Sequence, residues 1–391
     1  MIQREIYLDN SATTRISEGA LNKYIEISRE FYGNPSSLHT LGFNAEKIIT
    51  SAKDTILSTL SAKGSSVIFT ASGSEANNLA IIGRALSKER YLKGAKIITS
   101  DGEHASVNEP LSRLEALGFK IVRIPTKNGT LDMKKLAEEL TPDTILVSMM
   151  MVNNETGALY DISAVSRLVK SKVPTAALHV DATQSYMKVP FTKSGIGADM
   201  ITISSHKIEG PKGVGALVVD NRIINERGLS PIIFGGGQEG GLRSGTENVP
   251  GIAAFAEAAK IAKQSFPARF EKYNLLRETL INRIEASKTL SGISITSPTS
   301  HAPHILNITL PGIKSETMLH YLSSFGIFVS SGSACSSNDR HVSSALVAYG
   351  RSEREADSSI RISFSDKNEI SDIDALVGAL ESGVEKLARV K

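Results

Sequence analysis

From residue 66 to residue 219 the sequence alternates between short apolar runs, rich in β-branched residues, and longer stretches of helical spacing. Repeated strand and helix units imply a mostly parallel sheet that is covered by helices on both faces. The sequence therefore predicts an α/β fold. The expected strands are residues 66–70, 96–99, 120–124, 144–152, 176–180, 200–203 and 214–219, and the expected helices begin at or near residues 74, 107, 132 and 163.

The C-terminal third of the chain contains a second, smaller group of elements. A glycine-rich loop at residues 234–245 is followed by a helical pattern from about Val249 to Glu285. The elements behind it indicate a small α+β domain, which an extended N-terminal arm would complete. We expect a large domain over residues 15–255 and a small domain made of residues 1–14 and 256–391. The expected small-domain strands are residues 305–310, 327–330 and 360–364, with helices from 315, near 343 and from about 372.

The charge balance of the 391-residue chain excludes some classes of partner. The chain has 44 Lys plus Arg against 41 Asp plus Glu, so its formal net charge is only +3, and no basic run stands out. A nucleic-acid partner is therefore not supported. The charged N-terminus lacks the apolar core of a signal peptide, and no stretch approaches the roughly 18 apolar residues of a membrane span. We expect a cytoplasmic protein without membrane contact.

Lys207 lies between two expected strands, in a loop with the sequence SSHKIEGPKG. Apolar surroundings would lower the pKa of its amine and make it a usable nucleophile or base. Asp181 ends the preceding strand, at the sheet edge where α/β folds bind ligands. The two side chains suit pyridoxal 5'-phosphate, because a lysine forms a Schiff base with this cofactor while an aspartate keeps its pyridine nitrogen protonated. A solvated loop lysine and a buried salt bridge are the plainer interpretations of the same residues.

The segment TASGSE, residues 70–75, passes from a strand through a turn of small residues into a helix. Unpaired N–H groups and the positive end of the helix dipole make such a turn a site for anions. Gly73 would permit close approach and Ser74 would offer a hydroxyl group. Ordinary N-capping by a serine explains the pattern equally well.

Three further polar residues adjoin expected strands. His104 could stack on an aromatic cofactor and exchange protons near neutral pH, although a structural histidine gives the same pattern. Asn154 offers a short amide that could bind a phenolate or carboxylate oxygen, and a simple turn is the alternative. Arg361 suits bidentate carboxylate binding, and a surface salt bridge would explain it too.

Cys335 is the one cysteine in the chain and lies in SGSACSS, a run of small residues. A single cysteine rules out an intrachain disulfide and a cysteine-rich metal site built by one chain, and we expect no metal. A core cysteine would be expected within an apolar pattern. We therefore predict a reactive thiol on a loop that can move, because attack requires an accessible thiolate.

Taken together, these motifs resemble the pyridoxal-phosphate-dependent cysteine desulfurases of the NifS/IscS kind, within the class V aminotransferase superfamily. The resemblance implies the type I aminotransferase fold, in which a large domain has a mostly parallel, seven-stranded type of sheet between helices and a smaller domain is α+β. It also implies a homodimer with active sites at the subunit interface. The motifs, in family order, are YLDNSATT, GNPSSLH, TASGSEANN, EHAS, NNETG, HVDATQ, SSHKIEGPKG, RSGTEN and SGSACSS.

The resemblance implies a role for each matching residue. Lys207 is similar to the Schiff-base lysine, Asp181 to the partner of the pyridine nitrogen, and His104 to the stacking histidine, which is also catalytic. Arg361 resembles the anchor of the substrate carboxylate and Cys335 the sulfur acceptor. The other implied cofactor ligands are Gly73, Ser74, Asn154, Gln184, Ser204 and His206, with Thr246 supplied by the other subunit, and Asn154 and Asn34 are further implied substrate ligands.

The implied activity converts L-cysteine to L-alanine and leaves the sulfur on Cys335 as a persulfide. A sulfur-acceptor protein of iron–sulfur cluster assembly or tRNA thiolation would then receive it. The alternatives are a selenocysteine lyase or an aminotransferase of the same fold and, from another class, a catalytically silent sulfur-relay adaptor. We favour the desulfurase because the one cysteine lies in the SGSAC motif.

The sequence departs from the family pattern at a few positions. Ser74 replaces a common threonine but keeps the hydroxyl group, and Phe43 replaces a frequent arginine. Residues 340–343, RHVS, replace a more usual Leu-Glu-Pro-Ser, and the chain ends at Lys391 without the C-terminal extension of housekeeping members. We therefore expect persulfide formation more firmly than delivery to an iron–sulfur scaffold.

Overall fold

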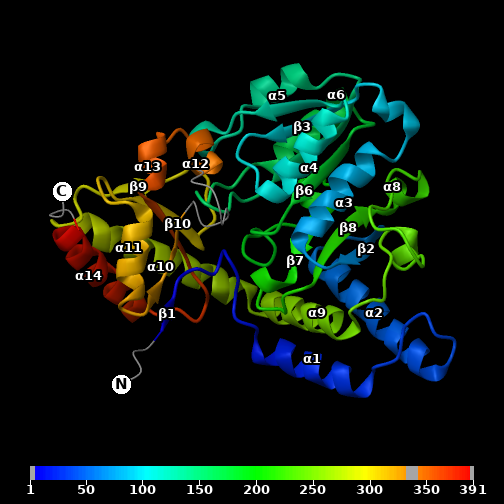
Figure 1. Ribbon diagram of the computed structural model, residues 1–391, viewed down its shortest axis with the longest axis horizontal. Helices are drawn as coiled ribbons and strands as arrows, with labels where there is room; N and C mark the ends of the chain where they lie inside the picture. The colour runs from blue at the N-terminus through cyan, green and yellow to red at the C-terminus, as the bar shows by residue number, and fades with distance from the viewer. Residues whose placement is uncertain (1–4, 332–341, 388–391) are drawn as a thin grey trace.

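The computed structural model describes residues 5–331 and 342–387. Its larger unit contains a seven-stranded sheet with the order β2-β8-β7-β6-β5-β3-β4 (Figure 1). Neighbouring strands from β7 to β4 are parallel, whereas β8 runs antiparallel to both β2 and β7. The predicted α/β fold with a mostly parallel sheet is therefore confirmed. The strands are β2 (Ser65–Thr70), β3 (Lys96–Ser100), β4 (Lys120–Ile124), β5 (Thr144–Met150), β6 (Ala177–Asp181), β7 (Met200–Ser204) and β8 (Gly215–Asp220).

Helices cover both faces of this sheet because both faces are apolar. Adjacent residues of a strand point to opposite faces, and Ile97 and Ile98 of β3 accordingly belong to different core clusters. The helices α3 (Gly73–Ala85) and α4 (Ala105–Ala116) pack on one side, and α2 (Thr40–Thr59), α6 (Ile162–Lys172) and α9 (Val249–Gln264) contribute to the core on the other. The large unit also contains α1 (Glu18–Glu30), α5 (Met133–Glu139), α7 (Lys193–Ile196) and α8 (Asn221–Asn225).

The smaller unit is built on a four-stranded antiparallel sheet with the order β12-β13-β10-β9. The N-terminal arm completes it, because β1 (Ile6–Tyr7) pairs with β11 (Ile327–Phe328). The expected single strand at 327–330 is thus two short strands, β11 and β12, in different sheets. The remaining elements are β9 (Ser294–Thr296), β10 (Ile305–Thr309), β12 (Ser330–Ser331), β13 (Ser359–Ser363), α10 (Phe266–Ala286), α11 (Ser315–Ser323), α12 (Ser344–Tyr349), α13 (Glu353–Asp357) and α14 (Ile370–Leu387).

The connection between the two units runs through α9 and α10 (Figure 1). The expected continuous helical pattern over 249–285 is interrupted at Ser265. Pro267 lies in the first turn of α10, where a backbone N–H would have no intrahelical partner, so a proline is tolerated there. Helix α9 is unbroken through residue 256, and its Ala259 and Ala262 belong to the core of the large unit. The boundary expected after residue 255 falls inside α9, and we propose that the division lies at Ser265.

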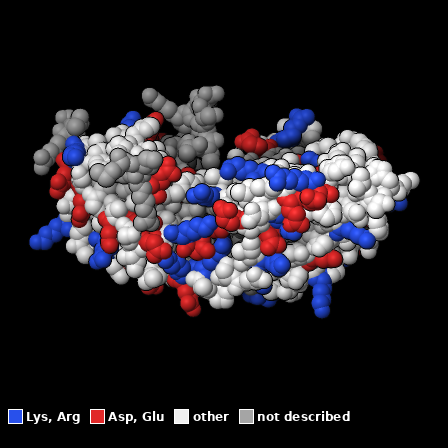
Figure 2. Space-filling model, turned by 90° about the horizontal axis from the view of Figure 1, so that it is seen from below, with Lys and Arg blue, Asp and Glu red and all other residues white. Residues whose placement is uncertain are grey.

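The surface and the helices add two observations. On the face shown in Figure 2, Lys and Arg side chains are interspersed with Asp and Glu, so no broad area carries one sign of charge. Among the described residues, no helix is both long and apolar enough to cross a membrane.

Candidate active site

A cavity of about 500 Å³ lies where the carboxyl ends of β5, β6 and β7 meet β12 and β13 of the small unit. Ligands bind at this edge of open α/β sheets. Ten residues that were predicted from the sequence line the cavity together: Gly73, Ser74, His104, Asn154, Asp181, Gln184, Ser204, His206, Lys207 and Arg361.

Lys207 occupies the last position of a short 3-10 turn, Ser205–Lys207, which follows β7 directly. Its Nζ donates hydrogen bonds to the carbonyl oxygens of Ser11 (2.5 Å) and Ala12 (2.8 Å) in the N-terminal arm. Gly210 permits this turn, because a Cβ atom there would lie 2.1 Å from Ser205 Oγ. The arm and the glycine therefore fix the amine at the wall of the cavity.

Asp181, the last residue of β6, presents a buried carboxylate to the same cavity. Its Oδ1 accepts a hydrogen bond from Thr183 N (2.9 Å), and its Oδ2 accepts one from Asn77 Nδ2 (2.8 Å). Asn77 was not predicted from the sequence. It lies three residues after Ser74 on α3, and residues at this spacing share a helix face, so the first asparagine of the motif TASGSEANN could have indicated it.

Asn77 also connects Asp181 to His104, the residue that precedes α4. Asn77 Nδ2 lies 2.9 Å from Ser106 Oγ, which lies 2.9 Å from His104 Nδ1. His104 Nδ1 accepts a hydrogen bond from Ser106 N (3.1 Å), which places the proton of the neutral ring on Nε2. Burial lowers the pKa of His104. A neutral ring can lie against an aromatic cofactor without adding positive charge.

The start of α3 forms the polar end of the cavity. Ser72 is the N-cap, and its Oγ accepts a hydrogen bond from Glu75 N (3.1 Å). The first intrahelical bond joins Ala76 N to Ser72 O, so the N–H groups of Gly73 and Ser74 precede the helical ladder, where helices bind anions. Ordinary capping and an anion site therefore occur together at this turn.

Ser204 and Gln184 indicate that the cavity binds a polar group. Ser204 Oγ and Gln184 Oε1 are buried and have no hydrogen-bond partner in the described part of the chain. Buried polar atoms nearly always have a partner, so these two atoms are suited to a ligand. A Cβ atom on Gly73 would lie 3.2 Å from Ser204 Cβ, which shows how closely the helix start approaches β7.

His206 lies beside these groups in the turn after β7. Its Nδ1 is 3.1 Å from Thr13 Oγ1. Burial, together with the positive charges of Lys207 and Lys188, lowers the pKa of His206 to about 4. The imidazole is therefore neutral at physiological pH and can donate or accept a hydrogen bond at the polar end of the cavity.

Arg361 projects from β13, on the small-unit side of the cavity. The side chain is 7% exposed, so a surface salt bridge does not describe it. Its Nη2 donates to Asp9 Oδ1 (2.8 Å) and its Nη1 to the carbonyl oxygen of Asn154 (2.9 Å). Its Nε is buried and has no partner among the described residues. The guanidinium is thus oriented for an incoming carboxylate.

Two predicted residues lie elsewhere, and a third is outside the described residues. Asn34 is exposed in the loop between α1 and α2, where its Oδ1 accepts a hydrogen bond from Ser36 N (3.0 Å). Thr246 lines a separate small cavity. Cys335 lies outside the described residues. Of the described residues that flank its segment, Ser330 lines the site, and Ser343 donates a hydrogen bond to Glu155, next to Asn154.

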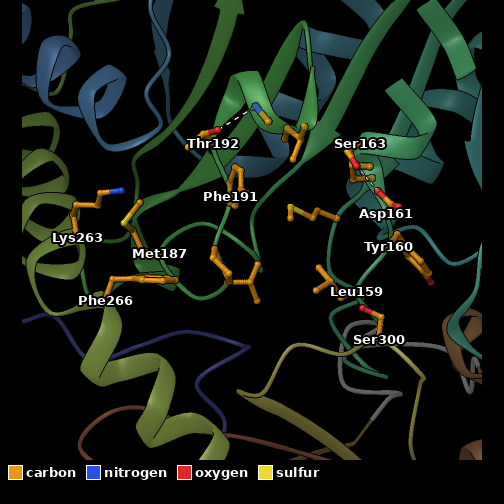
Figure 3. A pocket seen from close by; sticks show the side chains of 16 residues that line it. Leu159, Tyr160, Asp161, Ser163, Met187, Phe191, Thr192, Lys263, Phe266 and Ser300 are labelled. Atoms are coloured by element: carbon orange, nitrogen blue, oxygen red, sulfur yellow. Dashed lines mark hydrogen bonds between the residues drawn. The ribbon is translucent and has the colours of Figure 1, made fainter. Parts of the chain in front are cut away.

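A larger cavity of about 910 Å³ lies apart from this site and is mainly apolar (Figure 3). Met187, Phe191 and Phe266 contribute to its wall. Two of its polar groups are engaged within the chain, since Thr192 Oγ1 accepts from Gly195 N (3.1 Å) and Asp161 Oδ1 from Ser163 Oγ (2.6 Å). None of the predicted site residues lines it, so the chemistry points to the smaller cavity.

Known proteins match almost the entire chain. The aminotransferase class-V family matches residues 6–376. The chain belongs to this family. The class-V chain is 38% identical over 385 residues to "Cysteine desulfurase IscS 1" of Archaeoglobus fulgidus, covering 97% of each protein. It is 35% identical over 391 residues to "Cysteine desulfurase IscS" of Dictyoglomus turgidum, covering 100% of this chain and 97% of that protein.

Solved structures agree with this assignment. A structure titled "NIFS-LIKE PROTEIN" superimposes with a TM-score of 0.89 at 32% identity, covering 98% of this class-V chain and 100% of that chain. A NifS-like protein from Rickettsia africae gives a TM-score of 0.85 at 32% identity, covering 97% and 99%. The expected family and the type I aminotransferase fold are confirmed.

The cavity fits pyridoxal 5'-phosphate, the cofactor of this family. The helix start at Gly73 and the unpartnered Ser204 hydroxyl suit its phosphate. The Asp181 carboxylate and the Lys207 amine suit its ring nitrogen and aldehyde, and both line the same cavity. The cavity therefore offers groups suited to the phosphate, the ring nitrogen and the aldehyde of the cofactor.

Proposed function

We propose that this class-V aminotransferase is a pyridoxal-phosphate-dependent cysteine desulfurase, which converts L-cysteine to L-alanine and passes the sulfur to Cys335. One observation carries the proposal: the Lys207 amine, the Asp181 carboxylate and the anion-binding start of α3 converge on one cavity together with Arg361. Full-length relatives that are named cysteine desulfurases support the same activity.

Bound pyridoxal phosphate supplies an electron sink that makes the α-proton of an amino acid removable. Asp181 would keep the pyridine nitrogen of the cofactor protonated. The backbone N–H of Gly73 would bind the phosphate of the cofactor. His104 would lie against the ring. The other proposed cofactor ligands are Ser74, Asn154, Gln184, Ser204, His206 and, from a second subunit, Thr246.

Lys207 would take the α-proton of the substrate, since its Nζ lies at the wall of the cavity. Arg361 would bind the substrate carboxylate through the N–H groups that face the site, with Asn154 beside it and Asn34 of a second subunit as a further ligand. Attack by the Cys335 thiolate on the substrate sulfur forms an S–S bond and breaks the C–S bond. The electron pair of that bond stays on the carbon, which takes up a proton to become the methyl group of alanine, and Lys207 would return a proton to the α-carbon.

We also propose that the protein is a homodimer. Large apolar side chains are exposed around the α1–α2 loop and near residue 234: Tyr32 (73%), Phe43 (52%) and Phe234 (81%). Exposed apolar residues of this size are typical of an interface. Asn34 and Thr246 belong to the same regions of the chain, so a second copy could bring them to its partner's site.

The persulfide requires a recipient, and we propose a sulfur-acceptor protein of iron–sulfur cluster assembly or of tRNA thiolation. The expected cytoplasmic location stays a prediction. The relatives do not favour a selenocysteine lyase, a same-fold aminotransferase or a silent adaptor. Binding of pyridoxal phosphate distinguishes the silent adaptor from the enzymes. An adaptor has no need to bind the cofactor through a lysine, whereas each of the enzymes does.

The experiment is alanine release from L-cysteine by cofactor-loaded protein and three variants. The natural protein and Lys212→Ala, an exposed lysine in the same loop, should release alanine. Lys207→Ala and Cys335→Ala should not. Continued release by Cys335→Ala would sink the persulfide route and favour the lyase alternative.

A further inference from the structure

A buried lysine behind the active site has no part in the proposed activity. Lys188 lies in the turn after β6 and is 4% exposed. Its Nζ is buried and has no hydrogen-bond partner among the described residues. A buried ammonium without a partner is costly, so the site must either keep this amine neutral or provide something that stabilises its charge.

Lys188 and Lys207 both line a second, small cavity, and Lys207 also lines the active-site cavity. Its volume is about 10 Å³, close to the smallest that admits one water molecule. Asn10, Glu209 and Ser365 also line it, so a water there has polar neighbours. A water in this cavity would have both lysines among its neighbours.

The carboxylates near Lys188 are already paired. Glu209 accepts a hydrogen bond from Arg269 Nη2 (3.2 Å), and Arg269 Nε lies 3.0 Å from Asp366 Oδ2. Burial lowers the pKa of Lys188 to about 7, and the charge of Lys207 is the next largest cause, while Glu209 acts in the opposite direction. The titratable and charged groups that surround Lys188 are Lys207, Arg361, Glu209, Arg269, Tyr273, Asp366, Lys367, His206 and His304.

We propose that Lys188 is the proton partner of Lys207. Only one of the two amines is protonated at a time, and Lys188 takes up the proton that Lys207 releases. Two like charges beside one buried cavity disfavour each other, so they titrate as a pair. The carbonyl groups of Ser11 and Ala12 accept hydrogen bonds from Lys207 Nζ and would stabilise a proton there. When Lys207 acts as a free amine, the charge can move to Lys188 instead of leaving the protein.

The transfer is balanced without any further reactant. An N–H bond of the Lys207 ammonium breaks as its proton passes to the cavity water, and another proton of that water forms an N–H bond with Lys188 Nζ. Lys188 touches neither substrate nor cofactor, so it is a positioning residue that acts through Lys207. The inference rests on the proposed function, in which Lys207 must be unprotonated to take the α-proton.

The test uses the full chain without cofactor or cysteine, so its outcome is independent of desulfurase activity. The rate at which trinitrobenzenesulfonate modifies Lys207 is measured by peptide mass from pH 7 to pH 10.5, because only the neutral amine reacts. In Lys188→Met the rate at pH 8 should fall about threefold or more, since Lys207 has lost its proton acceptor. The two rates should converge at the highest pH.

Two further variants separate proton transfer from packing. Lys188→Gln keeps a polar side chain but cannot take up a proton near neutral pH, so its Lys207 modification rate should match that of Lys188→Met. If Lys188→Met does not fold, Lys188→Gln is used in its place. Lys193→Met removes another buried lysine, which is paired with Asp220 (3.0 Å) and does not line this cavity, and it should match the natural protein. A Lys207 profile unchanged in Lys188→Met, or restored in Lys188→Gln, would overturn the proposal.

Discussion

Substitution of Asn77 by alanine should weaken both the fold and cofactor binding, because Asn77 holds the Asp181 carboxylate. Asn77 is 1% exposed and donates to Asp181 Oδ2 (2.8 Å), and its Nδ2 also lies 2.9 Å from Ser106 Oγ. A hydrogen bond to a charged group contributes about 1.5–3 kcal/mol to stability. When a buried carboxylate loses a donor, the free energy of removing that oxygen from water is no longer compensated. Alanine recovers only about 0.5 kcal/mol of helix propensity.

We therefore expect Asn77→Ala to lower the free energy of unfolding of the cofactor-free protein by about 2–3 kcal/mol. The Asp181 carboxylate would also be less well oriented for the cofactor. A similar loss of binding free energy should raise the Kd for pyridoxal phosphate about 10- to 100-fold, since every 1.4 kcal/mol changes Kd tenfold. Urea unfolding measures the first quantity, and fluorescence titration of the cofactor measures the second.

The neighbouring asparagine provides the matched control. Asn78 Nδ2 donates only to Ser74 O (2.9 Å), at the exposed side of α3, and should tolerate alanine with little change in either quantity. Equal effects of Asn77→Ala and Asn78→Ala, or an unchanged cofactor Kd in Asn77→Ala, would refute the reasoning.

Three other substitutions test the site. Gly210→Ala should lower the melting temperature and cofactor affinity together, because its Cβ atom would lie 2.1 Å from Ser205 Oγ and overpacking costs about 1–3 kcal/mol; normal values for both would contradict this. Asp9→Ala should cost about 3–5 kcal/mol in urea unfolding, because it leaves the charge of Arg361 buried, and Asp9→Asn should cost less. Burial raises the pKa of Glu103 to about 8. The part of the free energy of unfolding that depends on its protonation is therefore fully present below pH 4.5 and is lost as the pH rises to 8, at up to about 1.4 kcal/mol per pH unit. Glu103→Gln should remove that slope from urea unfolding measured across pH 4.5–8, and an equal slope in both proteins would be inconsistent with the assignment.

The sequence predicted the site residues that follow from local patterns. Asp181 ends β6 and Lys207 follows β7, and these two strands are adjacent and parallel in the sheet. Because the carboxyl ends of parallel strands meet at one edge, the proximity of the two residues could be inferred. The start of α3 was recognisable because a turn of small residues separates a strand pattern from a helical pattern, and the first N–H groups of a helix have no intrahelical partner. These predictions required only the order of the elements.

Contacts between distant parts of the chain could not be predicted in this way. The pairing of Arg361 with Asp9 joins positions 352 residues apart, and nothing in either local pattern specifies it. Lys188 resembles any loop lysine in the sequence, and its burial arises only when the two units pack together. The division that we propose at Ser265 differs from the expected one because α9 continues to Gln264 and α10 begins only at Phe266.

The central claim is that Cys335 accepts the sulfur of L-cysteine. Intact-protein mass, measured after brief incubation of the cofactor-loaded protein with L-cysteine and before any reductant is added, tests it most directly. We expect a gain of one sulfur atom, located by peptide mapping to Cys335 and accompanied by an equal amount of alanine. Alanine without the added sulfur, or sulfur bound elsewhere in the chain, would contradict the account.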